Sequence, residues 1–328
     1  MLYSQCIRSQ RLPVIFGLLI LLFFLNHFYL NPPKPVSKNV NHIARSFDRP
    51  IQERKSKQKI VEINDRQPSF KMYIDEGYEI AAARNRAQAK VLDNIKLHDK
   101  CQQNPKFIVV DVGASLGQFG LYAAACGCQV YMFEVNPMKL SLLQASIKLN
   151  SFESRITLFS KAVTDLPSNV KIYMSLNTSN QIPDKDIRDQ SDVYAVETIS
   201  LNQLNFSSDV YLLRVDVEGY EIHVFRASEK LFLHNLVHHV LFQYNPIETN
   251  RVIQGDLLAY MRDILGGKRF YALHPKQAII YGPLYNEDID QFSMQHQAQN
   301  LERDVYVLFQ DEEINIDSKS YDFQTSFQ

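Results

Sequence analysis

Three kinds of hydrophobic pattern follow one another along this chain. From Leu12 to Leu30, nineteen residues carry no charged side chain, and as a helix they measure roughly 28 Å, close to the thickness of a bilayer core. Residues 31 to 70 are polar and contain five prolines, which is typical of a stem or linker. From residue 106 onward, short apolar runs alternate with amphipathic stretches, which indicates strands separated by helices.

This alternation predicts an α/β domain, a mostly parallel sheet with helices on both of its faces. The expected strands are Phe107–Val112, Gln129–Phe133, Ile156–Val163, Val210–Val215, Val237–Phe242, Phe270–Leu273 and Val305–Phe309. Helices are expected at Tyr78–Asp99, Leu116–Cys126 and Pro137–Leu149, where apolar residues recur at helical spacing. We expect the last two strands to form an antiparallel hairpin at the edge of the sheet.

These patterns divide the chain into four parts. We predict a cytoplasmic tail over 1–11, a transmembrane signal-anchor over 12–30, a stem over 31–70 and one domain over 71–328, with its core at about 106–310. Arg8 and Arg11 precede the apolar segment closely, which favours a cytoplasmic N-terminus. The domain is then lumenal, in the Golgi or endoplasmic reticulum, or extracellular. A cleaved signal peptide is the alternative, although no small-x-small cleavage site follows the segment.

Charge and cysteine usage exclude two classes of function. The 35 basic and 36 acidic residues are interspersed, so no broad basic face is available and nucleic acid is not expected as a partner. The four cysteines form no paired CxxC motifs, which makes a structural metal site improbable. The spacing of His234, His238 and His239 also matches no standard metal site. Cys101 could form a disulfide with Cys126 or Cys128, and buried free thiols explain the same residues equally well.

The strongest chemical signal is the stretch from Val109 to Gly117, where an apolar strand runs into a glycine-containing turn that opens a helix. Glycine has no Cβ to block a ligand, and doubly wound sheets bind ligands at the carboxyl end of the first strand. Glu134 follows the second strand, where its carboxylate could accept hydrogen bonds from two ribose hydroxyls. The turn and this acid together predict a nucleoside site.

The spacing of the glycines favours one nucleoside over another. Dinucleotide folds use GxGxxG to place a pyrophosphate on the helix N-terminus, whereas this turn reads GASLG. Asp111 before the first glycine would oppose a pyrophosphate but suits the ammonium group of a methionine moiety. We therefore predict S-adenosylmethionine as cofactor, with a ligand-free tight turn as the alternative. The predicted cofactor-binding residues in this region are Asp111, Gly113, Ala114, Ser115, Gly117 and Glu134.

A second group of acids follows the strand Val210–Val215. These acids are Asp216, Glu218 and Glu221. Because they follow the end of a strand, we expect them at the carboxyl edge of the sheet, the same edge as the glycine turn. A carboxylate there could orient and deprotonate a substrate hydroxyl. Alternatively, these acids only cap the next helix through its N-terminal amides.

These motifs resemble the FkbM methyltransferases. The stretches VDVGASLGQFGLYAAACGCQVYMFEVNP, KAVTD, ISLNQL and VYLLRVDVEGYEIHVFRASEKLF carry the likeness. The resemblance implies a Rossmann-like class I methyltransferase fold with a seven-stranded sheet. It also implies that Asp165 lies near the adenine and that Asp216, Glu218 and Glu221 face the reacting centre. This sequence departs from the family pattern at Val135, Asn202, Arg214 and Gln243.

The resemblance and the predicted topology lead to one function and two alternatives. We expect an S-adenosylmethionine-dependent methyltransferase that methylates a hydroxyl of a glycan or of another small or lipid-linked acceptor. Recognition of the acceptor is expected in loops such as 175–193 and 285–299. The departures from the family pattern leave open a non-catalytic membrane-anchored binding module. A dinucleotide-dependent oxidoreductase would need a GxGxxG turn, which this sequence does not show.

Overall fold

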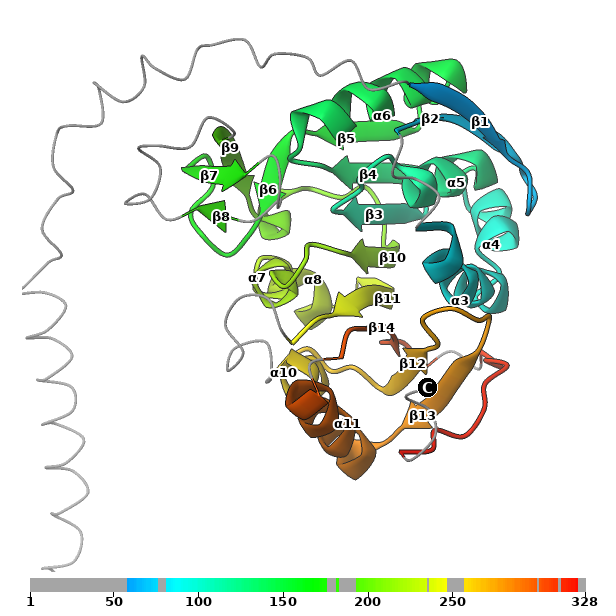
Figure 1. The fold of residues 1–328 in the computed structure, drawn as a ribbon, viewed down its shortest axis with the longest axis vertical. Helices are drawn as coiled ribbons and strands as arrows, with labels where there is room; N and C mark the ends of the chain where they lie inside the picture. The colour runs from blue at the N-terminus through cyan, green and yellow to red at the C-terminus, as the bar shows by residue number, and fades with distance from the viewer. Residues whose placement is uncertain are drawn as a thin grey trace, which may run out of the picture. The chain divides into compact units, whose positions relative to one another are not determined.

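The computed structural model describes residues 58–75, 81–175, 181–182, 193–234, 236–246, 257–299, 301–311 and 314–323 (Figure 1). All the described elements belong to one compact unit, residues 54–328. The predicted tail and signal-anchor lie outside the described residues. Within the described part of the chain, no helix is both long and apolar enough to cross a membrane.

An eight-stranded sheet forms the centre of the domain (Figure 1). In spatial order its strands are β13 (Ile280–Leu284), β12 (Arg269–Leu273), β14 (Arg303–Leu308), β11 (Val237–Tyr244), β10 (Val210–Val215), β3 (Ile108–Val112), β4 (Gln129–Phe133) and β5 (Ile156–Phe159). The five strands from β11 to β5 are parallel, and β14, β12 and β13 continue the sheet through antiparallel pairs. The sheet is therefore mixed, with a parallel half that holds the glycine turn.

Helices cover both faces of this sheet, as the sequence predicts. On one face lie α3 (Ala81–Asn94), α4 (Leu97–Gln103), α5 (Gln118–Cys126) and α6 (Pro137–Leu149). On the other lie α7 (Glu221–Arg226), α8 (Glu229–Leu233), α10 (Leu257–Asp263) and α11 (Asn286–Gln299). Every residue of β3 is buried, because a central parallel strand is covered on both sides. Val109 therefore belongs to one hydrophobic core and Val110 to the other.

The start of α6 was correctly predicted. The side chain of Asn136 accepts hydrogen bonds from the amides of Met138 and Lys139, and Pro137 occupies the first turn. An N-cap acceptor followed by proline satisfies the free amides of a helix start and fixes its direction. This cap holds the loop after β4 in place, and Glu134 belongs to that loop.

A β-hairpin precedes the first helix and corrects the predicted extent of the stem. β1 (Lys59–Ile63) pairs with β2 (Phe70–Ile74), and Phe70 and Met72 are buried in the core. Ser146 of α6 accepts a hydrogen bond from the main chain of β2 at Tyr73. The stem prediction was wrong for residues 59 to 70, because the alternating apolar residues of β2 pack against α6.

A smaller sheet of four strands contains residues that the sequence assigns elsewhere. It is formed by β6 (Lys161–Val163), β9 (Val193–Ile199), β7 (Lys171–Ser175) and β8 (Gln181–Ile182). A short 3₁₀ helix, η4 (Leu201–Gln203), follows β9. The single strand predicted over Ile156–Val163 was wrong. Its first half pairs with β4 and its second half with β9, so the chain passes from one sheet to the other after Phe159.

Two other expectations about elements are corrected. The helix predicted over Tyr78–Asp99 is two helices, α3 and α4, because Lys96 adopts a left-handed conformation with φ 52°. The predicted edge hairpin is also wrong, although β12 and β14 do pair antiparallel. β13 forms the edge instead, and α11 separates it from β14 along the chain. The sheet thus has eight described strands where seven were expected.

One of the two disulfides that the sequence left open is present. Cys101 of α4 is bonded to Cys128, which precedes β4, with Cα atoms 5.0 Å apart. Cys126 is a buried free thiol. The bridge joins the end of α4 to the segment that connects α5 to β4.

Replacing Cys101 by Ser should lower the free energy of unfolding by about 2–4 kcal/mol. The bridge closes a loop between residues 27 positions apart and so reduces the conformational entropy of the unfolded chain. Cys128→Ser should cause the same loss. Denaturant unfolding of the purified, non-reduced protein measures both values. The matched control is Cys126→Ala, for which we expect a loss of about 1 kcal/mol. A peptide map that places Cys126 in the bridge would contradict the assignment.

Candidate active site

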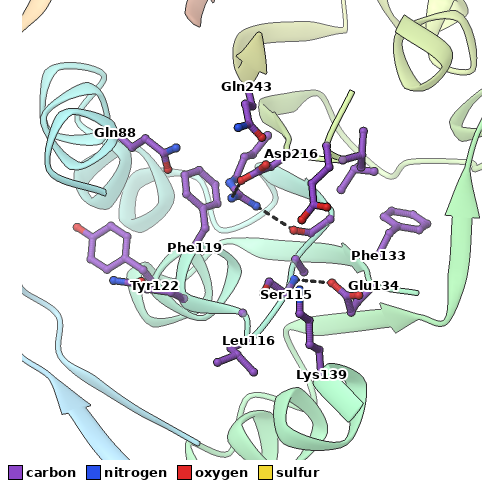
Figure 2. Close-up of a pocket in the computed structure, with 18 of the residues that line it drawn as sticks. Gln88, Ser115, Leu116, Phe119, Tyr122, Phe133, Glu134, Lys139, Asp216 and Gln243 are labelled. Carbon is purple, nitrogen blue, oxygen red and sulfur yellow. Dashed lines mark hydrogen bonds and ion pairs between the residues drawn. The ribbon is translucent and has the colours of Figure 1, made fainter. Parts of the chain in front are cut away.

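A cavity of about 1170 Å³ opens at the carboxyl edge of the parallel strands. Its wall includes the glycine turn after β3, Glu134 after β4, Asp216 after β10 and Gln243 at the end of β11. Figure 2 shows these groups around one space, with Ser115 beside Glu134 and with Gln243 on the other side of Asp216. The position agrees with the predicted ligand site at this edge of the sheet.

The glycine turn has the conformation that its sequence suggests. Gly113 and Gly117 have φ of 82° and 88°, and Ser115 has φ of 53°. A Cβ on Gly113 would overlap with the main-chain carbonyl of Asp216, and one on Gly117 would overlap with the side chain of Leu143. Gly113 is therefore required by the close approach of the turn to the main chain after β10. At Gly117 the positive φ is the stronger constraint, because the Leu143 side chain can move. Residues 113 to 117 all line the cavity, and cofactor binding by Gly113, Ala114, Ser115 and Gly117 stays a prediction.

Glu134 is connected directly to this turn. One carboxylate oxygen accepts a hydrogen bond from the amide of Ser115 at 2.6 Å, and the other accepts from the amides of Val135 and Asn136 at 2.9 and 2.7 Å. Each carboxylate oxygen has two lone pairs, so the oxygen bonded to Ser115 can accept a further hydrogen bond from a ligand. Glu134 lines the cavity, in the place that the sequence predicts.

Asp111 is not on the wall of the cavity, contrary to the prediction that it contacts the cofactor. Its side chain is 0% exposed, and one of its oxygens lies 2.8 Å from Nη1 of Arg214 on the neighbouring strand. The other oxygen accepts a hydrogen bond from the amide of Gly120 at 3.2 Å. Asp111 was placed wrongly because the sequence does not reveal that a buried arginine takes up its charge.

Arg214 joins two carboxylates at the floor of the site. Besides Asp111, it binds the carboxylate of Asp216 at 2.7 Å and the main-chain carbonyl of Gly113 at 3.2 Å. Its guanidinium lies 5.4 Å from the centre of the Phe119 ring. Burial raises the pKa of the Asp111 carboxyl, and the guanidinium of Arg214 opposes that rise. We call Asp111, Arg214 and Asp216 the arginine bridge.

The three acids after β10 occupy different environments. Asp216 and Glu218 line the cavity, and their position at a reacting centre stays a prediction. Glu218 has φ of 53°, an uncommon conformation for a residue with a side chain. This tight turn brings both carboxylates to the cavity, so the two acids remain candidates for binding a substrate hydroxyl.

Glu221 does not face the cavity, so its predicted catalytic role is corrected. It is 0% exposed and accepts hydrogen bonds from the amides of Val217 and Gly219 at 3.1 and 3.2 Å. Burial raises its pKa to about 7, and the three amide hydrogen bonds of the turn, including its own, oppose that rise. Glu221 therefore holds the turn that carries Asp216 and Glu218. This differs from the helix-capping alternative, because Val217 and Gly219 precede α7.

Asp165 lies next to the cavity rather than on its wall. Its carboxylate bonds Nδ1 of His223 at 2.9 Å, and the adjacent Thr164 and His223 both line the cavity. The prediction that Asp165 lies near the adenine is therefore not tested directly. The structure adds His223, a residue on α7 that sequence reasoning did not select.

The end of the cavity next to β11 holds a cluster of amides around one carboxylate. Glu302, which precedes β14, accepts hydrogen bonds from the side-chain amides of Gln243 at 3.1 Å and of Asn245 at 3.0 Å. Nearby on the cavity wall, Gln88 of α3 donates to Asp304 at 2.9 Å. We call Gln243, Asn245 and Glu302 the amide cluster. The sequence pointed only to Gln243, as a departure from the family pattern.

Two further expectations concern residues away from this cavity. His239 donates to or accepts from the hydroxyl of Tyr306, and His238 bonds Asp209, so these histidines have protein partners. The segment 285–299, expected as a loop that recognises the acceptor, is mostly helix α11 and packs against α10. Of the other expected loop, residues 176–180 and 183–192 lie outside the described residues.

Comparison with known proteins identifies the domain. Residues 111–270 match the family model described as the methyltransferase FkbM domain, which confirms the resemblance seen in the motifs. No curated protein matches this chain at a significant level.

Solved structures show only a distant likeness. The METTL16 MTase domain aligns at 10% identity and a TM-score of 0.35, over 66% of this chain and 66% of that one. Cofactor-bound Rv0187 from MTB aligns at 10% identity and a TM-score of 0.38, over 71% and 90%. WbdD in complex with the kinase inhibitor LY294002 aligns at 11% identity and a TM-score of 0.41, over 75% and 46%. No function follows from scores this low.

Replacing Arg214 by Met should lower the free energy of unfolding by about 3–5 kcal/mol, because it leaves the buried Asp111 carboxylate without its cation. Denaturant unfolding at pH 7 measures this loss. The matched control is Arg262→Met, because Arg262 also bridges two aspartates, Asp263 and Asp290, that are 56% exposed. There we expect about 1 kcal/mol or less. Equal losses in the two variants would contradict a buried role for Arg214.

Glu221 should make the protein less stable as pH rises from about 4.5 to about 7. Its pKa in the folded state lies above its ordinary value of 4.5, so folding disfavours the charged form and the loss begins above pH 4.5. Glu221→Gln should remove this loss, and we expect the variant to gain up to about 3 kcal/mol relative to wild type at pH 8. Unfolding measured at pH 4.5, 6 and 8 tests this, and a pH-independent difference would refute it.

Proposed function

We propose that this protein, whose residues 111–270 match the methyltransferase FkbM domain, transfers a methyl group from S-adenosylmethionine to a hydroxyl group of a glycan or of another small or lipid-linked acceptor. One observation carries the choice of cofactor. The acid after β4 and the glycine turn after β3 are hydrogen-bonded to each other, through Glu134 and Ser115, on the wall of one large cavity.

The residues present fit this cofactor. Its ribose would lie against Glu134, whose carboxylate can still accept hydrogen bonds from hydroxyls. The turn from Gly113 to Gly117 presents main chain to the cavity, and its sequence has no GxGxxG for a pyrophosphate. Phe133 lines the cavity and stacks on Phe159 with ring centres 4.7 Å apart, which offers an apolar surface for a base. These features favour a single nucleoside over a dinucleotide.

S-adenosylmethionine, when bound, supplies an electrophilic methyl group together with its own leaving group. The chain then has to align a hydroxyl and receive its proton. Asp216 and Glu218 line the cavity with their carboxylates, and we assign them this task. Arg214 fixes the Asp216 side chain by a 2.7 Å ion pair, so Asp216 orients the hydroxyl while the exposed Glu218 is available to take the proton.

We also propose that the segment Leu12–Leu30 anchors the protein in a membrane and that the domain lies on the lumenal or extracellular side. The apolar length of the segment supports the anchor. The disulfide between Cys101 and Cys128 supports the placement, because disulfides persist in oxidising compartments. Such a location would give the domain access to glycans as acceptors.

Calorimetric titration of S-adenosylmethionine into the full chain in detergent tests the cofactor. We expect micromolar binding, and we expect Glu134→Gln to weaken it by tenfold or more. The physical reason is the loss of a charge-assisted hydrogen bond, which contributes about 1.5–3 kcal/mol. The matched control is Glu153→Gln, an exposed glutamate that does not line the cavity, and it should bind as wild type does.

Two outcomes would reject this proposal. Absence of binding by the folded wild-type protein would favour the non-catalytic module. Binding of NAD in the same titration, in place of S-adenosylmethionine, would favour the oxidoreductase.

A further inference from the structure

The amide cluster lies on the cavity wall and is not used by the proposed reaction. Gln243, Asn245 and Glu302 all line the cavity, and they come from the end of β11 and from the residue before β14. Gln243 is only 7% exposed and Asn245 only 3% exposed. Polar side chains held this deep at the edge of a cavity require a physical explanation.

Glu302 sets the orientation of both amides. A carboxylate only accepts hydrogen bonds, so each amide must turn its NH₂ group toward it. Gln243 does so at 3.1 Å and Asn245 at 3.0 Å. A flipped Gln243 amide would place its carbonyl oxygen against the carboxylate, which is repulsive. The orientation of Gln243 is therefore determined by its neighbour.

This orientation leaves one acceptor unused. Oε1 of Gln243 is buried and accepts no hydrogen bond from any group among the described residues. A buried carbonyl without a donor costs free energy, and that cost is removed when a ligand donates to it. The same amide has a second N–H, so Gln243 can accept from one hydroxyl and donate to another.

The position of the cluster separates it from the cofactor side of the cavity. Along the sheet edge, Glu134 follows β4, the glycine turn follows β3, Asp216 follows β10 and Gln243 is the penultimate residue of β11. Adjacent strands are about 4.8 Å apart, so the cluster lies about three strand spacings from Glu134 and about one from Asp216. Figure 2 shows the same order, with Asp216 between Gln243 and Glu134.

We propose that the amide cluster is the acceptor subsite and that it binds vicinal hydroxyl groups of an uncharged sugar ring, which places a neighbouring hydroxyl at Asp216. This inference rests on the proposed methyl transfer and adds the chemical class of the acceptor. Planar amide and carboxylate groups present paired donors and acceptors, which match the paired hydroxyls of a sugar.

The charge of the cluster argues for a neutral ring. The two oxygens of Glu302 are held by two neutral amides, so its negative charge is not cancelled within the cluster. A carboxylate or phosphate group of the acceptor that contacted the cluster would be repelled by the negative charge of Glu302. The subsite should therefore distinguish a neutral hexose from the corresponding uronic acid.

Saturation-transfer NMR on the full chain in detergent tests the inference with defined probes. These are the methyl glycosides of glucose, galactose, mannose, fucose and xylose, and the methyl glycosides of glucuronic and galacturonic acid. We expect at least one neutral glycoside to bind, and we expect the glycosides of glucuronic and galacturonic acid to bind more weakly than those of glucose and galactose. Gln243→Met and Glu302→Gln should each weaken that binding by tenfold or more, since they remove the unused acceptor or the group that orients it.

The controls separate the subsite from the cofactor site. Gln291→Met makes the same change at an exposed position of α11 and should bind the glycosides as wild type does. S-adenosylmethionine affinity, measured by calorimetry, should change by less than about threefold in Gln243→Met and Glu302→Gln. A cooperative denaturant unfolding transition shows that these variants are folded.

Each outcome has a defined meaning. If wild type binds no neutral glycoside, or if Gln243→Met binds one as tightly as wild type, the subsite is wrong. Equal binding of a hexoside and its uronic acid counterpart would overturn its preference for neutral rings. If glycosides bind and depend on Gln243 but S-adenosylmethionine does not bind, the proposed function fails while the sugar subsite is upheld.

Discussion

The arginine bridge is the interaction on which the rest of the site depends. Arg214 holds a fully buried carboxylate, Asp111, on one neighbouring strand and the carboxylate of Asp216 beyond the end of its own strand. Taking these charges out of water is expensive, and it is tolerated only because each has a close partner. The bridge therefore fixes β3 and β10 relative to each other at their carboxyl ends, where the glycine turn and the acidic turn meet.

The two turns are also held by contacts between their main chains. Gly113 lies so close to the carbonyl of Asp216 that a Cβ would not fit. Glu221 holds the acidic turn because its carboxylate accepts hydrogen bonds from two main-chain amides of that turn. Glu134 does the same for the glycine turn through Ser115. The acids of the site thus have different roles. Glu221 supports a turn, Asp216 and Glu218 line the cavity, and Glu134 does both.

The sequence predicted some of these roles and missed others for identifiable reasons. Glu134 and the glycine turn were correctly placed, because the end of a parallel strand fixes where the next residue lies. Asp111 and Glu221 were assigned to ligand contact although both are buried. Their positions in the sequence motifs are the same whether the side chain points into the cavity or into the protein interior, so the sequence could not distinguish the two. The amide cluster was not predicted, since Glu302 lies 59 residues beyond Gln243 in the chain.

The sequence by itself determined most of the parallel strands, the start of α6 and the edge of the sheet at which the cavity opens. Those features follow from local patterns of apolar residues, glycines and caps, which act within a few residues of one another. Only the tertiary structure decided which acids face the cavity, which cysteines are bonded and which polar groups gather beside β11. Such pairings join residues on strands and helices that are distant in sequence. Their hydrogen bonds and ion pairs become strong only when folding buries the two partners side by side.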